Sequence, residues 1–132
     1  MAQITVDRDQ VRLVRTDLEG ATFGPASTAV NEGRYVTQNT AGKFVHGGSG
    51  GQPGIAFSRA IRGNYTVSVM QRGLLELGAG LQGVAIGTTV FADPSDGTLH
   101  DATGTGFVEV GKVSGHQLES RQPTRRLLRV NL

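Results

Sequence analysis

One pattern of turns and strands occurs twice in this chain, and it restricts the folds that the chain can adopt. Each copy has a Gly-x-x-Val segment, a glycine turn, a strand that opens on glycine and a closing apolar strand. The first copy has them at Gly33–Val36, Gly42, Gly54 and residues 65–70, and the second at Gly87–Val90, Gly97, Gly111 and residues 127–132. A repeat of this kind predicts two related halves, residues 28–73 and 74–132, within one structural module.

The composition favours strands over helices. At 132 residues the chain has the length of a single domain. It contains 20 glycines, no tryptophan and no cysteine, so its core must consist mainly of Val, Leu, Ile and Ala, without disulfides. We therefore expect an all-β barrel or sandwich in which the apolar face of one half covers that of the other. The expected facing sets are Val36, Phe57, Val67 and Val69 on one half and Val90, Val113, Leu128 and Val130 on the other.

Residues 1–27 precede the repeat and have no counterpart in its second copy. Apolar residues such as Ile4, Val6 and Val11 alternate weakly with charged ones, which is typical of an exposed strand or an extended arm. The segment carries no basic leader and the chain has no long apolar run, so we expect neither a secretion signal nor a membrane partner. The sequence thus predicts an extended N-terminal arm, residues 1–27, and a single β domain, residues 28–132.

Local signals predict several turns. Asn39–Gly42, Arg62–Asn64 and Ala92–Gly97 carry the residues that tight turns prefer, and the glycine-rich residues 46–54 are predicted to form a surface loop. Residues 114–124 are also expected to be a loop. The segment from Leu74 to Leu81 fits either a strand or one short helical turn.

Positive charge concentrates at the C-terminal end. The formal net charge of the chain is +2, while residues 112–132 contain Lys112 and several arginines against a single acid, Glu119. The candidates for contact with an acidic partner are Arg121, Arg125 and Arg126. Apolar residues alternate with the basic ones, and no aromatic platform for base stacking accompanies them. This pattern favours a strand with a charged outer face, and we expect no nucleic-acid partner.

The side chains that could carry chemistry form no known constellation. His46, His100 and His116 lie in or beside turn segments, and none has a second metal ligand at helical spacing. The aspartates around Gly97 lack the alternating ligands and terminal Glu of a calcium loop, so a hairpin turn is the favoured interpretation. The Gly47–Gly51 run lacks the Gly-Lys-Ser/Thr of a phosphate loop, and no nucleophile elbow occurs. We assign no catalytic, cofactor-binding or metal-binding residue and predict that the protein is not an enzyme.

Six segments, taken in order, carry a resemblance to a known family. They are Val30–Val36, Gly54–Ala56, Val67–Val69, Arg72–Leu77, Ile86–Asp93 and Val110–Val113. This succession resembles the capsid decoration, or head cement, proteins of tailed bacteriophages, over residues 28–132. The resemblance implies a small β-barrel-like or β-tulip fold, made in the host cytoplasm, that binds the outer surface of an expanded capsid. Such proteins commonly bind as trimers at threefold or quasi-threefold positions, with the major capsid protein as partner.

The resemblance also implies a role for the N-terminal segment, because that region often contacts the capsid or a neighbouring subunit in such proteins. The capsid-contact residues that it suggests here are Val11, Arg12, Leu13 and Arg15. A subunit that bridges capsomers and binds the mature lattice alone would stabilise that lattice by mass action.

Two other classes of function are open at this stage. A carbohydrate- or surface-binding β-module of a phage fibre or tail would use exposed aromatic rings, and this chain has only Tyr35 and Tyr65 beside its phenylalanines. A hydrolase with a cryptic site is permitted by the serines, histidines and aspartates, although no spacing supports it.

Overall fold

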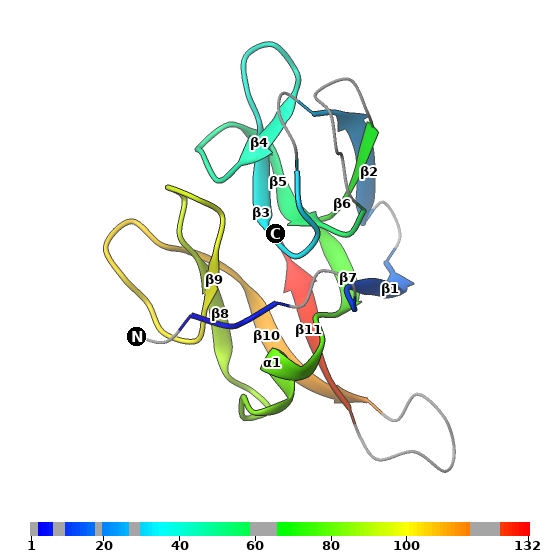
Figure 1. Ribbon diagram of the computed structural model, residues 1–132, viewed down its shortest axis with the longest axis vertical. Coiled ribbons are helices and arrows are strands. Elements are labelled where there is room, and N and C mark those ends of the chain that lie inside the picture. The colour runs from blue at the N-terminus through cyan, green and yellow to red at the C-terminus, as the bar shows by residue number, and fades with distance from the viewer. Residues whose placement is uncertain (1–2, 7–9, 18–19, 27–29, 59–65, 117–124) are drawn as a thin grey trace.

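The computed structural model describes residues 3–6, 10–17, 20–26, 30–58, 66–116 and 125–132, and they form two antiparallel sheets (Figure 1). The all-β prediction is confirmed. The strands are β1 (Arg12–Thr16), β2 (Ala21–Pro25), β3 (Tyr35–Gln38), β4 (Phe44–His46), β5 (Gly51–Ala56), β6 (Thr66–Met70), β7 (Arg72–Glu76), β8 (Thr89–Ala92), β9 (Leu99–His100), β10 (Val108–His116) and β11 (Arg125–Asn131). A single short helix, α1 (Ala79–Gln82), occurs in the described part of the chain.

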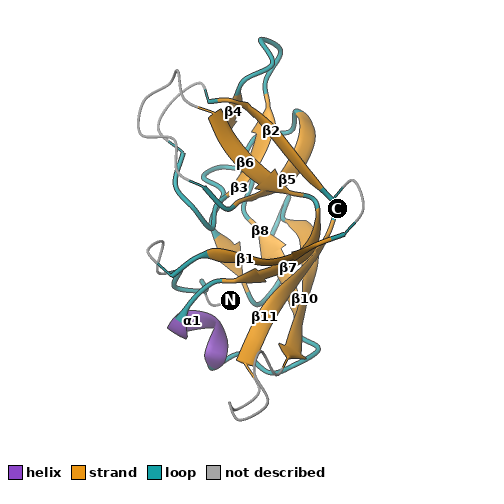
Figure 2. Cartoon of the chain, turned by 90° about the vertical axis from the view of Figure 1, so that its right-hand side faces the viewer, coloured by secondary structure: helices purple, strands orange, loops and turns teal. Residues whose placement is uncertain are grey.

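The two sheets lie one above the other in both ribbon views (Figures 1 and 2). One has five strands in the order β2-β6-β5-β3-β4, and the other has six in the order β1-β7-β11-β10-β8-β9. The arrangement is therefore a pair of sheets, and neither sheet closes into a continuous barrel.

Both sheets have the same topology. If β2 to β6 are numbered 1 to 5 along the chain, they lie side by side in the sheet in the order 1-5-4-2-3. The strands β7 to β11, numbered in the same way, lie in the same order in the other sheet. The repeat that the sequence predicts is thus a repeat of sheet topology, and each copy forms its own sheet. The repeated unit begins with β2 in the first copy and with β7 in the second, which is earlier than residues 28 and 74, where the sequence pattern places the two starts. Strand β1 is the one described strand without a counterpart, and it lies beside β7.

Equivalent hydrogen bonds fix the two Gly-x-x-Val segments. The N–H of Gly33 donates to the carbonyl of Ala56 in β5 at 2.8 Å, and the N–H of Gly87 donates to the carbonyl of Val113 in β10 at 2.8 Å. Both glycines have a positive φ, 82° and 92°, a backbone conformation that side chains other than glycine rarely adopt. The chain turns there in the same way twice and then enters β3 or β8.

Both predicted hairpin turns that lie in the described residues are confirmed. The Gly42 N–H donates to the Asn39 carbonyl at 2.9 Å between β3 and β4, and the Gly97 N–H donates to the Asp93 carbonyl at 2.8 Å between β8 and β9. The turn predicted at residues 62–64 lies outside the described residues.

The segment from Leu74 to Leu81 combines both of its predicted structures, since β7 ends at Glu76 and α1 begins at Ala79. The loop predicted over residues 114–124 is wrong for residues 114–116, because strand β10 continues to His116 and pairs with β11 as far as Arg125. The rest of that prediction, residues 117–124, lies outside the described residues.

The core consists of two clusters. The larger one lies between the sheets and contains Tyr35, Ile55 and Met70 of the five-stranded sheet together with Val90, Val113, Leu128 and Val130 of the six-stranded sheet. The smaller one lies on the opposite face of the five-stranded sheet and contains Val36, Val67 and Val69 with Phe44 and Val30. The expected facing of Val36, Val67 and Val69 against the second half is therefore wrong, because in a strand adjacent residues point to opposite faces. Of that set, Phe57 does pack against the larger cluster.

The N-terminal residues form part of the folded domain. Ile4 is buried in the larger cluster, and its N–H donates to the carbonyl of Leu99 in β9 at 2.8 Å. Residues 12–16 then form β1, which pairs with β7 at the opposite edge of the six-stranded sheet (Figure 1). The described N-terminal residues thus contact both edge regions of this sheet. The following strand, β2, pairs with β6 in the five-stranded sheet.

Candidate functional site

Strand β1 carries three of the four residues that were suggested for capsid contact, with Val11 directly before it, and it forms the edge of the six-stranded sheet. Arg12 and Arg15 are exposed, with 64% and 54% of their side-chain surface accessible. Leu13 is 44% exposed, and among the described large apolar side chains only Phe23 and Ile86 are more exposed. Val11 differs from Arg12, Leu13 and Arg15 because it packs against the larger core cluster. The structure therefore presents Arg12, Leu13 and Arg15 to solvent along one open strand.

A buried carboxylate connects this strand to the basic C-terminal strand. Glu76 of β7 accepts a hydrogen bond from Nε of Arg12 at 2.8 Å, and it also pairs with Nη2 of Arg125. Its side chain is only 8% exposed. A buried carboxylate is costly unless it is paired, so the two guanidinium groups stabilise it while they remain at the surface themselves. The structure thus brings together two predicted contact residues, Arg12 and Arg125, through a third that was not predicted.

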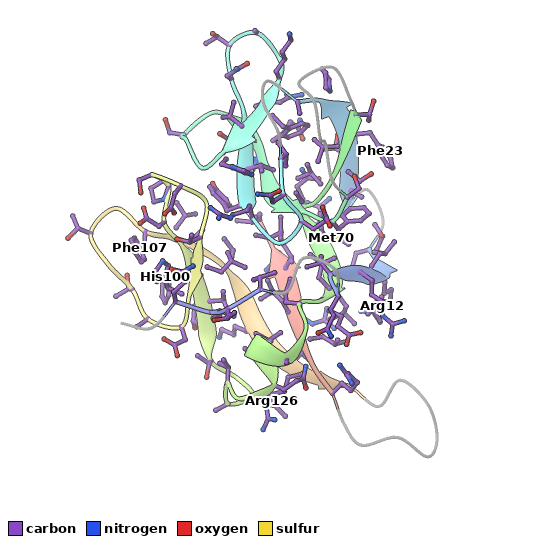
Figure 3. The ribbon with its side chains drawn as sticks, in the orientation of Figure 1. Arg12, Phe23, Met70, His100, Phe107 and Arg126 are labelled. Carbon is purple, nitrogen blue, oxygen red and sulfur yellow. The ribbon has the colours of Figure 1, made fainter. Side chains whose placement is uncertain are left out.

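The other two basic candidates have different environments. Arg126 binds the end of α1: its Nη1 donates to the Gln82 carbonyl at 2.6 Å, and its backbone N–H and C=O pair with the Gln82 side chain at 2.9 Å (Figure 3). This side chain has a structural role in holding the helix to β11. Arg121 lies outside the described residues.

The outer face of the six-stranded sheet carries further cations. Across the strands, Arg15 of β1 lies opposite Leu74 of β7, Leu74 opposite Arg129 of β11, and Arg129 opposite Lys112 of β10. Directly opposed residues point to the same face of a sheet. Their neighbours Leu75, Leu128 and Val113 belong to the larger core cluster, so this row points away from the core.

The predicted chemistry-bearing residues in the β8–β9 turn have structural partners. Asp93 accepts hydrogen bonds from the N–H and hydroxyl of Ser95, and Asp96 accepts them from the N–H and hydroxyl of Thr98. The two bonds from Thr98 lower the pKa of the Asp96 carboxyl, and the bond from its backbone N–H has the larger effect. The buried ring of His100 lies 3.0 Å from the Thr98 hydroxyl and packs on Phe107 (Figure 3). The hairpin-turn interpretation of this region is confirmed.

The remaining histidines and tyrosines are also located. Nε2 of His46 accepts a hydrogen bond from the N–H of Asn31 at 3.0 Å, and burial lowers the pKa of this ring, with Arg34 acting in the same direction. His116 lies in β10. Tyr35 is buried at 4% exposure and cannot stack on a sugar, while Tyr65 lies outside the described residues.

The described residues contain neither a metal-binding cluster nor a membrane-spanning helix. None of their His, Asp or Glu side chains gather in threes as a metal ion would require. No helix among them combines the length and apolar character needed to cross a membrane.

Fold and surface together define a small all-β protein of two topologically equivalent sheets, with a basic edge and outer face on one of them. No protein-family model matches the chain, and no curated protein matches it. Its function is therefore inferred from the fold, the surfaces and the segments that carry the family resemblance.

Proposed function

We propose that this protein is a virion structural protein that binds the outer surface of an expanded phage capsid and stabilises it by bridging capsomers. Its partners are the major capsid protein and other copies of itself, arranged as a trimer at threefold or quasi-threefold positions. The resemblance of residues 28–132 to the capsid decoration proteins of tailed bacteriophages suggests this role.

The observation that carries the proposal is the position of β1. It lies at the edge of its sheet and has no counterpart in the duplicated topology. An edge strand has backbone groups without a partner on one side, and a strand of another protein can pair with them. Proteins usually protect such edges with charged side chains, as Arg12 and Arg15 do here, but Leu13 between them is exposed. This combination supports a docking strand.

Bridging gives the proposed mechanism its physical basis. A ligand that binds only the expanded lattice lowers the free energy of that lattice by an amount that grows with the logarithm of the ligand concentration relative to its Kd. In a trimer, the first contact raises the effective concentration of the other two, so modest contacts at each edge act together. The paired sheets would serve as the rigid body that holds the docking strands in position.

A pair of matched substitutions tests the docking strand. Leu13→Glu places a charge on β1, where the account requires an apolar contact with the capsid. Phe23→Glu makes the same kind of change on β2, the edge strand of the other sheet, where Phe23 is 67% exposed (Figure 3). In co-sedimentation with expanded capsids, Leu13→Glu should weaken binding about tenfold or more and Phe23→Glu should change it less than about twofold.

Because both side chains are exposed, both variants should keep the circular dichroism of the parent protein. Unchanged capsid binding by the folded Leu13→Glu variant would overturn the role of β1. An equal loss in both variants would indicate a general effect of added charge and would also contradict it.

A further inference from the structure

The outer face of the six-stranded sheet has a feature that the edge strand alone does not explain. We define the basic face as Arg12, Arg15, Lys112, Arg125 and Arg129. The register places Arg15, Arg129 and Lys112 in one row over β1, β7, β11 and β10. At a spacing of about 4.8 Å per strand, the row is about 14 Å long.

Two acidic groups beside this row are already engaged: Glu76 is buried between Arg12 and Arg125, and Asp17 lies 3.5 Å from Nε of Arg15. A third, the exposed Glu109 of β10, lies outside the row, where it pairs in register with Phe91 of β8. Lys112 is exposed and Arg129 is partly exposed. The face therefore keeps an excess of positive charge that solvent, or a partner, can reach.

The pairing of Lys112 with Arg129 is unfavourable for the isolated protein. These residues are directly opposed in the antiparallel ladder of β10 and β11. Like charges at directly opposed positions destabilise a sheet. A bound anion would remove this repulsion, so the pair is better suited to binding than to folding.

Glu76 shows which anion fits. Its carboxylate, on this same face of β7, is held by guanidinium groups from the strand β1 on one side and from β11 on the other. Arginine presents donors whose fork matches a carboxylate, and Glu76 holds two of these side chains in position. The Nε–H of Arg125 has no hydrogen-bond acceptor among the described residues.

We propose that the basic face binds a carboxylate-rich surface of another protein. A nucleic acid is the other polyanion to consider, and single-stranded nucleic acid is usually held by exposed aromatic rings as well as cations. Here the side chains in the middle of the face are Leu74 and Leu127, and both are buried. Whether the partner is a capsid protein or another protein, the contact joins the cations of the basic face to carboxylates.

Binding of the full chain to poly-L-glutamate, followed by isothermal titration calorimetry, tests this inference. Lys112→Glu and Arg129→Glu should each weaken binding at least about tenfold at low salt, because each reverses one charge in the row. The matched control is Lys43→Glu, which makes the same charge change at an exposed residue of the β3–β4 turn on the other sheet and should alter affinity less than about twofold.

A second readout separates binding from folding. Lys112→Glu turns a repulsive cross-strand pair into an attractive one, so its thermal midpoint should equal or exceed that of the parent while its affinity falls. If Lys43→Glu weakened poly-L-glutamate binding as much as Lys112→Glu does, net charge alone would explain the effect, and the inference would be overturned. The absence of any binding to poly-L-glutamate would also overturn it. Tighter binding of duplex DNA, lost in the same variants, would overturn the choice of a protein partner. None of these outcomes bears on the Leu13→Glu test of capsid binding, so the two proposals can fail separately.

Discussion

Glu76 is a buried acidic residue whose charge is compensated by arginines from two neighbouring strands. Its buried carboxylate has two guanidinium partners, of which Arg12 is largely exposed and Arg125 is half-buried. One partner is enough to compensate a buried charge partly, whereas none leaves the full desolvation cost. The two arginines should therefore substitute for each other in stabilising the fold.

This redundancy predicts a non-additive effect on stability. Arg12→Ala and Arg125→Ala should each lower the free energy of unfolding by about 1 kcal/mol or less, as expected for partly exposed ion pairs. The double variant should lose about 3 kcal/mol, since Glu76 is then buried without a partner. Urea denaturation of the four proteins measures the coupling. A double variant that loses no more than the sum of the single losses would contradict the account.

The sequence indicates some of this chemistry but not its geometry. Arg12 was selected from the family resemblance and Arg125 from the concentration of basic residues near the C-terminal end, and the structure places both on Glu76. Glu76 itself gave one signal, an acid within the apolar run Leu74–Leu77. Its partners could not be predicted, since they depend on β1 and β11 lying on opposite sides of β7.

At the scale of elements, the duplicated turns can be compared position by position. Gly33 and Gly87 precede equivalent strands and share a positive φ. They differ in their surroundings: a Cβ on Gly33 would lie 2.3 Å from Cγ1 of Val6, whereas a Cβ on Gly87 would have no atom within 4 Å. The N-terminal segment, whose Val6 lies beside Gly33 and not beside Gly87, causes this difference.

Alanine at these two glycines should therefore have unequal costs. Gly87→Ala introduces backbone strain alone, and we expect a loss of about 1 kcal/mol. Gly33→Ala adds a steric conflict with Val6, and we expect about 2 to 3 kcal/mol. Thermal unfolding followed by circular dichroism gives both values. A larger loss for Gly87→Ala would show that the two turns are not related as described.

The elements were more predictable than their connections. Glycine turns and alternating strands depend on local sequence, and the turns at residues 39–42 and 92–97 are found as predicted. The order of strands in a sheet depends on distant pairing, which no local pattern specifies. Strand β2 illustrates this limit: it contains Gly24 and Pro25, residues that are rare in strands, yet Ala21–Pro25 pairs with β6 along an edge, where proline is tolerated.

At the scale of the whole molecule, the N-terminal segment has two roles. Ile4 is buried in the larger cluster and β1 pairs with β7, so residues 3–16 stabilise the second sheet. The same segment presents Arg12, Leu13 and Arg15 outward. Deleting it would remove core contacts together with the docking strand, which is why exposed single residues are the appropriate probes. Its weak alternation of apolar and charged residues is consistent with both roles.

The duplicated sheets pack around a shared core cluster, and the unduplicated strand β1 is the proposed contact with the capsid. The measurement that tests this account most directly is co-sedimentation of the protein with expanded and with unexpanded capsids of tailed phages. The account predicts saturable binding to expanded capsids, with affinity at least about a hundredfold higher than for unexpanded ones, because only a lattice-specific ligand stabilises one lattice over the other. Equal binding to both capsids, or binding to neither, would contradict it.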